Sequence, residues 1–127
     1  MSDRVKFLKC EICGNIAAMI NDNGPKIVCC GKPMGVIKAN TVDASKEKHV
    51  PLVTRVNGKL TVVVGAIAHP MEEKHYIEWI CVVQNEYVQR VTLKPGDAPS
   101  YEFADINEGT SDIYAYCNLH GLWKTSI

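Results

Sequence analysis

The sequence lacks an excess of charge of either sign, because its 127 residues include 14 Lys and Arg against 14 Asp and Glu. Nucleic acids and membrane surfaces attract basic proteins, so we expect neither as a partner. A long apolar run is also missing: the longest, residues 62–68, is far below the roughly 18 residues that a membrane helix needs. The first ten residues, MSDRVKFLKC, lack the apolar core and the small residues of a signal peptide. We therefore expect a soluble, cytoplasmic protein.

Cysteine, by contrast, is plentiful, with six residues in a chain long enough for one globular domain or for one domain and a small appendage. Without an export signal, six cysteines favour metal binding or redox chemistry over structural disulfides. Four of them crowd into the first 30 residues, while Cys81 and Cys117 stand alone. This distribution predicts two separate sites.

The N-terminal segment contains the knuckle Cys10-x2-Cys13, followed by Gly14, and then the adjacent pair Cys29 and Cys30. Neighbouring side chains of an extended segment point to opposite faces, so the pair can bind one metal only if the backbone turns sharply between them. Four thiolates in a tetrahedron accept zinc or a single iron. A purely structural zinc knuckle is the alternative, and a disulfide within the pair is a weaker one because it would leave the knuckle unused. A segment of about 37 residues needs such a metal to fold.

The residues between and after these cysteines predict two short strands around a turn at residues 23–25, whereas the pattern from about residue 36 is that of short strands separated by turns. Asn57-Gly58 is a strong hairpin signal, and further turns are expected at residues 94–97 and 108–109. About seven antiparallel strands favour an immunoglobulin-like β-sandwich. The predicted strands are residues 53–56, 59–67, 76–83, 87–93, 101–104, 112–117 and 122–125. We expect the domains to be residues 1–37 and 38–127.

Every histidine of the chain lies in the second part, at a strand end or in a loop: His49, His69, His75 and His120. One loop histidine is usually just a solvated polar residue, but four of them, one paired with a cysteine in Cys117-x2-His120, favour a metal site. A blue-copper site is an alternative on a β-sandwich, yet Thr125 stands where its axial Met is expected, and four histidines exceed its ligand set.

Cys81 does not fit either group. It alternates with Ile77, Trp79 and Val83, which predicts one inward-facing side of a strand and a buried core thiol.

Three motifs, taken in order with the four-cysteine segment, resemble one known family. The motifs EKHVP (47–51), HPMEEKHYIEW (69–79) and CNLHGLW (117–123) are similar to those of desulfoferrodoxin, the two-iron superoxide reductase. The resemblance implies a desulforedoxin-like or rubredoxin-like N-terminal domain followed by a neelaredoxin-like sandwich. It also implies one iron held by Cys10, Cys13, Cys29 and Cys30, and a second held by His49, His69, His75 and His120 as equatorial ligands with Cys117 as the axial ligand.

The same resemblance assigns functional roles to Glu47 and Lys48, the acidic and basic pair beside the open sixth position of the second iron. It implies reduction of superoxide to hydrogen peroxide, with electrons from a donor such as rubredoxin, in a homodimer with two iron ions per chain and neither haem nor flavin. Lys48 would attract superoxide and help to deliver a proton, and Glu47 would close onto the oxidised iron. Two other functions stay open: a rubredoxin-like electron carrier without catalysis, and a zinc-stabilised binding module.

Overall fold

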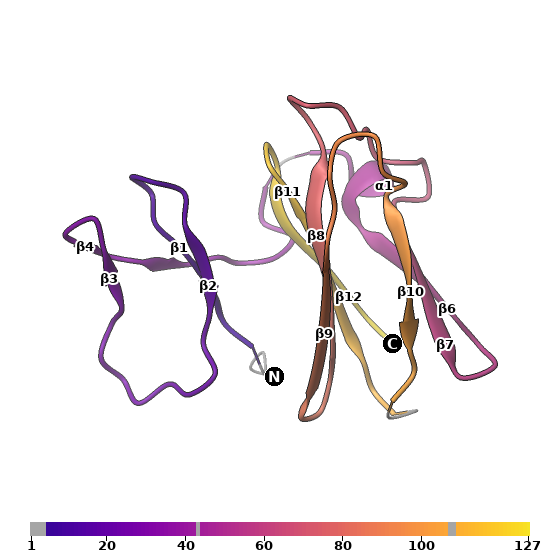
Figure 1. The fold of residues 1–127 in the computed structure, drawn as a ribbon, viewed down its shortest axis with the longest axis horizontal. Coiled ribbons are helices and arrows are strands. Elements are labelled where there is room, and N and C mark those ends of the chain that lie inside the picture. Colours follow the sequence, from indigo (N-terminus) through magenta and orange to yellow (C-terminus); the bar gives the residue numbers. More distant parts are fainter. Residues whose placement is uncertain (1–4, 43, 107–108) are drawn as a thin grey trace. The chain divides into compact units, whose positions relative to one another are not determined.

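The computed structural model describes residues 5–42, 44–106 and 109–127. Its chain divides into two compact units, Met1–Lys38 and Ala39–Ile127, which are coloured from indigo to yellow in Figure 1. None of the described helices is long and apolar enough to cross a membrane. The predicted turn at residues 108–109 begins at a residue outside the described ones.

The N-terminal unit is built from five very short antiparallel strands in two sheets. Three of them form a sheet of order β2-β1-β5, and the other two form the ribbon β3-β4. Their bounds are β1 Phe7–Lys9, β2 Ile16–Ala18, β3 Val28–Cys29, β4 Lys32–Pro33 and β5 Gly35–Val36. The two strands predicted around residues 23–25 are present, but they do not pair with each other, because β2 pairs with β1 and β3 with β4.

The second unit is an antiparallel β-sandwich of seven strands, as predicted. One sheet has the order β10-β7-β6 and the other β12-β11-β8-β9, and Figure 1 shows them as two layers. The strands are β6 Pro51–Val56, β7 Lys59–Val64, β8 Ile77–Gln84, β9 Tyr87–Thr92, β10 Ser100–Ala104, β11 Asp112–Cys117 and β12 Gly121–Ser126. The predicted hairpin joins β6 to β7, with Asn57 and Gly58 at φ values of 50° and 75° that favour these residue types.

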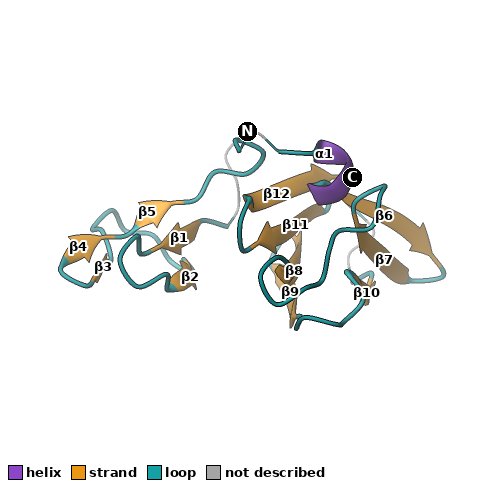
Figure 2. Ribbon diagram, turned by 90° about the horizontal axis from the view of Figure 1, so that it is seen from above, coloured by secondary structure: helices purple, strands orange, loops and turns teal. Residues whose placement is uncertain are grey.

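One element was not predicted. A four-residue helix, α1 (Lys46–His49), leads directly into β6, as Figure 2 shows. Its sequence has no apolar period of its own, so the helix is a product of the surrounding structure.

The sandwich core consists of inward-facing side chains from both sheets. Its buried members are Leu60, Val62, Val64, Ile77, Ile80, Val82, Leu93, Phe103, Ile113, Ala115 and Cys117. A metal ligand proposed from the sequence, Cys117, is therefore also part of the rigid core.

Cys81 is buried as predicted, at 1% exposure, but its predicted face was wrong in part. A β-bulge shifts the pairing of β8 with β11, so that Ile77 lies opposite Cys117 and joins the core. Trp79, Cys81 and Val83 therefore lie on the other face of this sheet. Burial raises the pKa of the Cys81 thiol to about 11.

Candidate metal centres

The four cysteines of the N-terminal unit converge on one point. Their sulfur atoms all lie within 4.8 Å of one another, and the Sγ atoms of Cys13 and Cys29 are 3.6 Å apart. All six cysteines of the chain are free thiols, so the disulfide alternative for Cys29 and Cys30 is not what forms here.

Local backbone geometry explains how the four sulfurs reach this point. In the first knuckle, the Cys13 N–H donates to Cys10 Sγ over 3.5 Å, and Gly14 has a φ of 82°. In the second, Cys30 has a φ of 53° and Gly31 one of 75°. The sharp turn that an adjacent cysteine pair requires is thus made by two successive residues in the left-handed region.

The pKa values of these thiols are those expected of a site that binds a cation. A backbone hydrogen bond from Cys13 lowers the pKa of Cys10 to about 6, whereas hydrogen bonds with Cys13, Cys10 and Cys29 raise the pKa of Cys30 to about 12. Four crowded sulfurs cannot all ionise unless a positive charge lies among them. The sulfur cluster therefore fits a metal ion with tetrahedral thiolate ligands.

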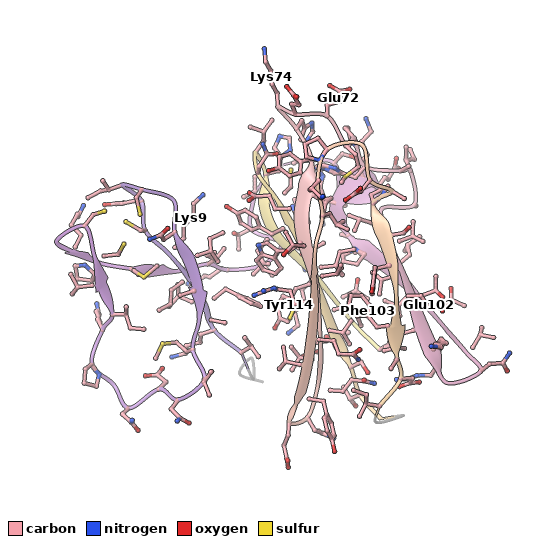
Figure 3. The ribbon with its side chains drawn as sticks, viewed as in Figure 1. Lys9, Glu72, Lys74, Glu102, Phe103 and Tyr114 are labelled. Atoms are coloured by element: carbon pink, nitrogen blue, oxygen red, sulfur yellow. The ribbon has the colours of Figure 1, made fainter. Side chains whose placement is uncertain are left out.

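The second cluster lies at one end of the sandwich and draws its side chains from four separate segments. His49 ends α1, His69 lies in the loop after β7, His75 precedes β8, Cys117 ends β11, and His120 lies in the turn before β12. Glu72 and Lys74, labelled in Figure 3, belong to the loop before β8 at this same end.

The four imidazoles form a nearly square ring. Going around it, neighbouring ring centroids are 4.6, 4.7, 5.0 and 4.9 Å apart, and their planes meet at 74° to 85°. The diagonal from His49 to His75 is longer, at 6.3 Å. Such a square is the arrangement that four equatorial ligands of one ion would adopt.

A thiolate accompanies this square. The donor atoms of His49, His69, His75 and Cys117 all lie within 4.8 Å of one another. His120 is not a member of that group, but its Nδ1 lies beside it, 3.1 Å from His49 Nε2 and 3.8 Å from Cys117 Sγ. The sulfur of Cys117 therefore lies close enough to the imidazoles to share one metal ion with them.

Two ring nitrogens of the cluster are left open for a ligand. His69 Nε2 and His75 Nε2 are buried without a hydrogen-bond partner among the described residues. His49 Nδ1 lies 2.6 Å from the Ser45 carbonyl and His69 Nδ1 2.7 Å from that of Pro70, so both rings donate outward and present an acceptor inward. Buried acceptors without donors fit a metal ion.

The charge states support the same conclusion. Burial lowers the pKa of His69 to about 4, against the opposing effect of the Pro70 carbonyl, and it also lowers the pKa values of His49 and His75. These three imidazoles are therefore neutral near pH 7, which is the form that binds metals. Burial raises the pKa of Cys117, and the N–H groups of Leu119 and His120 partly offset this.

Glu47 and Lys48 precede His49 in α1, and both are exposed. The positive charge of Lys48 is among the causes, after burial, that lower the pKa values of His49 and His75, so it acts on the imidazole square. A hydrogen bond fixes the backbone of this segment, since the Ile67 N–H donates to the Glu47 carbonyl over 3.0 Å.

Fold and sites together define a β metalloprotein with one sulfur-only centre and one imidazole-thiolate centre. Two family profiles match the chain: the desulfoferrodoxin N-terminal domain over residues 2–37 and desulfoferrodoxin over residues 41–126. Desulfoferrodoxins from Syntrophotalea carbinolica and Nitratidesulfovibrio vulgaris are 47% and 46% identical, and each alignment covers 98% of both chains. The chain belongs to the desulfoferrodoxin family, as its motifs predicted.

Solved structures agree with this family. The superoxide reductase from Treponema pallidum is 31% identical with a TM-score of 0.77, over 97% of this chain and 99% of that one. A superoxide reductase (neelaredoxin) from Archaeoglobus fulgidus, in the reduced form, is 31% identical with a TM-score of 0.57 and covers 65% of this chain and 88% of its own. The predicted combination of a small cysteine-rich unit and a β-sandwich is confirmed.

Some residues of the site were missed by sequence reasoning. The Trp123 ring stacks on His49 with centroids 4.9 Å apart, and its indole N–H donates to the His120 carbonyl over 3.1 Å. Gly65 lies against the carbonyls of Glu47 and Lys48, and Asn118 bonds to the backbone beside His75. The signal for Trp123 and Asn118 was their place inside the motif CNLHGLW; nothing local marked Gly65.

Proposed function

We propose that this chain is a superoxide reductase that holds one iron in each of its two centres and reduces superoxide at the imidazole-thiolate centre. The observation that carries the proposal is the square of four imidazoles with the sulfur of Cys117 beside it. The proposed ligands are His49, His69, His75, His120 and Cys117 for this centre, and Cys10, Cys13, Cys29 and Cys30 for the other. The proposal is supported by relatives that carry the name superoxide reductase, one that matches nearly the whole chain and one that matches only part of it.

The ligand charges suit an anionic substrate. Four neutral imidazoles and one thiolate leave a divalent ion with a formal charge of roughly +1, which attracts superoxide. Bound as the ferrous ion, iron supplies the single electron, and two protons complete the product, hydrogen peroxide. Cys117 would donate electron density to the centre, which favours protonation and departure of the product.

Lys48 and Glu47 act at the mouth of this centre. The exposed ammonium of Lys48 raises the local concentration of superoxide and is a source of the first proton, directly or through water. Glu47 carries a carboxylate next to it, and it closes onto the centre after oxidation, when the positive charge there has increased.

The proposal extends to an electron donor, a second copy of the chain and a cellular location. A rubredoxin-like donor is suggested by the family resemblance and by two exposed apolar side chains near the ligand segments, Leu119 at 60% and Ile67 at 51% exposure. A homodimer is suggested by the same resemblance and by Ile20, which is 96% exposed in the N-terminal unit. Cytoplasmic location follows from thiolate ligands, which persist in a reducing compartment.

The deciding experiment mixes reduced, iron-loaded protein with pulse-generated superoxide in the absence of oxygen. We expect one hydrogen peroxide for each superoxide consumed and for each imidazole-thiolate centre oxidised. Cys117→Ser should abolish the reaction, whereas Cys81→Ser, which alters another buried cysteine outside both centres, should leave it intact. If superoxide decays in the presence of the reduced, two-iron wild-type protein at the same rate as without protein, this result would instead support the electron-carrier alternative.

A further inference from the structure

Asn118 lies between two proposed ligands, Cys117 and His120, and its bonds all go to the segment that carries a third. The Tyr76 N–H donates to Asn118 Oδ1 over 2.9 Å, and Asn118 Nδ2 donates to the Lys74 carbonyl over 3.0 Å. The Asn118 backbone N–H donates to the Tyr76 carbonyl over 3.2 Å. These hydrogen bonds therefore fix the backbone on both sides of His75.

His75 needs this support more than its neighbours do. His49 and His69 are oriented by ring hydrogen bonds to backbone carbonyls, at 2.6 and 2.7 Å. In the described part of the chain, no protein group makes such a bond to the ring of His75, and its Nε2 is buried without a partner. The orientation of this ring therefore depends on its backbone, which pairs with Glu72 through two hydrogen bonds of 2.9 and 3.0 Å.

An amide is the side chain that suits this position. It must accept a hydrogen bond from one backbone group and donate one to another two residues away, and a carboxylate of the same size can only accept. The Lys74 side chain extends away from the loop in Figure 3, so Lys74 contributes to these hydrogen bonds only through its backbone carbonyl.

We propose that Asn118 is a positioning residue that holds His75 in register with Cys117 and His120, so that the imidazole-thiolate centre closes around its metal. The proposal rests on the metal site of the proposed function. It assigns Asn118 no contact with superoxide or with the metal.

The chain contains a matched control. Asn40 makes the same pattern of three bonds to β12: its Nδ2 donates to the Lys124 carbonyl over 3.2 Å, the Lys124 N–H donates to its Oδ1 over 2.9 Å, and its own N–H donates to the Leu122 carbonyl over 2.9 Å. None of these bonds flanks a proposed ligand. Asn40→Asp and Asn118→Asp are therefore the same chemical change at two similar sets of bonds. One set flanks the proposed ligand His75, and the other flanks Trp123, which contacts His49 and His120 but is not itself a proposed ligand.

The test measures the loss of iron from the folded, two-iron protein to a chelator, with the four-cysteine centre of the same molecule as an internal reference. Outer-shell changes of this kind typically weaken metal binding by about 10–100-fold. We expect Asn118→Asp to release iron from the imidazole-thiolate centre at least about 10-fold faster than wild type. Its thiolate-to-metal absorption should shift as well. Asn40→Asp should release iron from that centre clearly more slowly than Asn118→Asp, because its bonds flank no proposed ligand, and the four-cysteine centre should be unaffected in both variants.

Two results would overturn the positioning role. One is wild-type release and absorption in Asn118→Asp and in Asn118→Ala, and the other is equal acceleration in Asn40→Asp, which would mean only a general loss of stability. A wild-type protein that binds no iron at the imidazole-thiolate centre would refute the proposed function itself, and so the two failures are distinguishable. Because Asp has the size of Asn, the main variant leaves no cavity that could prevent folding.

Discussion

Gly65 offers a sharp test of how the Glu47–Lys48 segment is seated. A Cβ atom at this position would lie 2.5 Å from the Ile67 carbonyl oxygen, 2.6 Å from that of Lys48 and 2.7 Å from that of Glu47. These oxygens belong to the backbone and cannot rotate away. Gly65→Ala should therefore push α1, with both functional side chains, away from its support.

The expected loss of folding free energy in Gly65→Ala has two contributions. Gly65 has a φ of 90°, and holding a non-glycine residue in such a region costs about 1–3 kcal/mol. The overlap with three carbonyls adds about 1–3 kcal/mol, which is typical of overpacking. Gly96 has almost the same φ, 92°, but no heavy atom of the described residues within 4 Å of its Cβ position. Gly96→Ala therefore carries only the first cost, and the difference between the two variants isolates the contact with α1.

The assay is thermal unfolding followed by tryptophan fluorescence, because Trp79 and Trp123 both lie in the sandwich and report on it alone. For a unit of this size, 1 kcal/mol shifts the melting temperature by about 4–8 °C, so Gly65→Ala should melt roughly 4–24 °C below Gly96→Ala. It should also react more slowly with superoxide, with a weaker dependence on salt. Equal melting temperatures and equal rates in the two variants would refute the close seating of α1 on Gly65.

Three further predictions concern the proposed centres. Cys13→Ser should abolish the four-cysteine centre yet leave superoxide reduction nearly intact, because the ligand sets share no residue; loss of the reaction with the second iron still loaded and reduced would contradict independent centres. Glu47→Ala should leave the reaction of the reduced protein close to wild type, but change the spectrum of the oxidised centre and its access to azide; an unaltered spectrum would remove Glu47 from that centre. Lys48→Ile should slow the second-order reaction with superoxide about 10-fold and flatten its salt dependence, because salt screens exposed charges over about 10 Å at 0.1 M. Identical rates and salt slopes in stopped-flow or pulsed experiments would exclude steering by Lys48.

The strands of the sandwich could be predicted because their signals are local. Alternation of apolar residues and turn residues such as Asn57-Gly58 depend on neighbours in the chain, and the predicted hairpin is present with its left-handed turn. The N-terminal unit was harder, because its strands have only two or three residues, too few to show a period. Their pairing is decided by where the cysteine turns fall, which is why β2 and β3 have other partners than the expected ones.

The residues of both candidate centres could also be named from the sequence. Cysteine and histidine spacings, together with three family motifs, mark them without any knowledge of the fold. The short helix α1 could not be predicted, since its four residues form a helix only against Gly65 and the residues that follow it.

The kind of chemistry could be deduced from the sequence alone: which thiols and imidazoles are available, in which order, and on which strands and loops. How these groups meet depends on the packed fold. His49 and His120 are 71 residues apart in the chain, yet their nitrogens lie 3.1 Å from each other, and Asn118 reaches 42 residues back to Tyr76. The ring nitrogen that each histidine presents, the bulge that turns Ile77 into the core and the close approach at Gly65 all depend on contacts of this long range. Such contacts form only when the two sheets pack, so no local pattern in the sequence can encode their geometry.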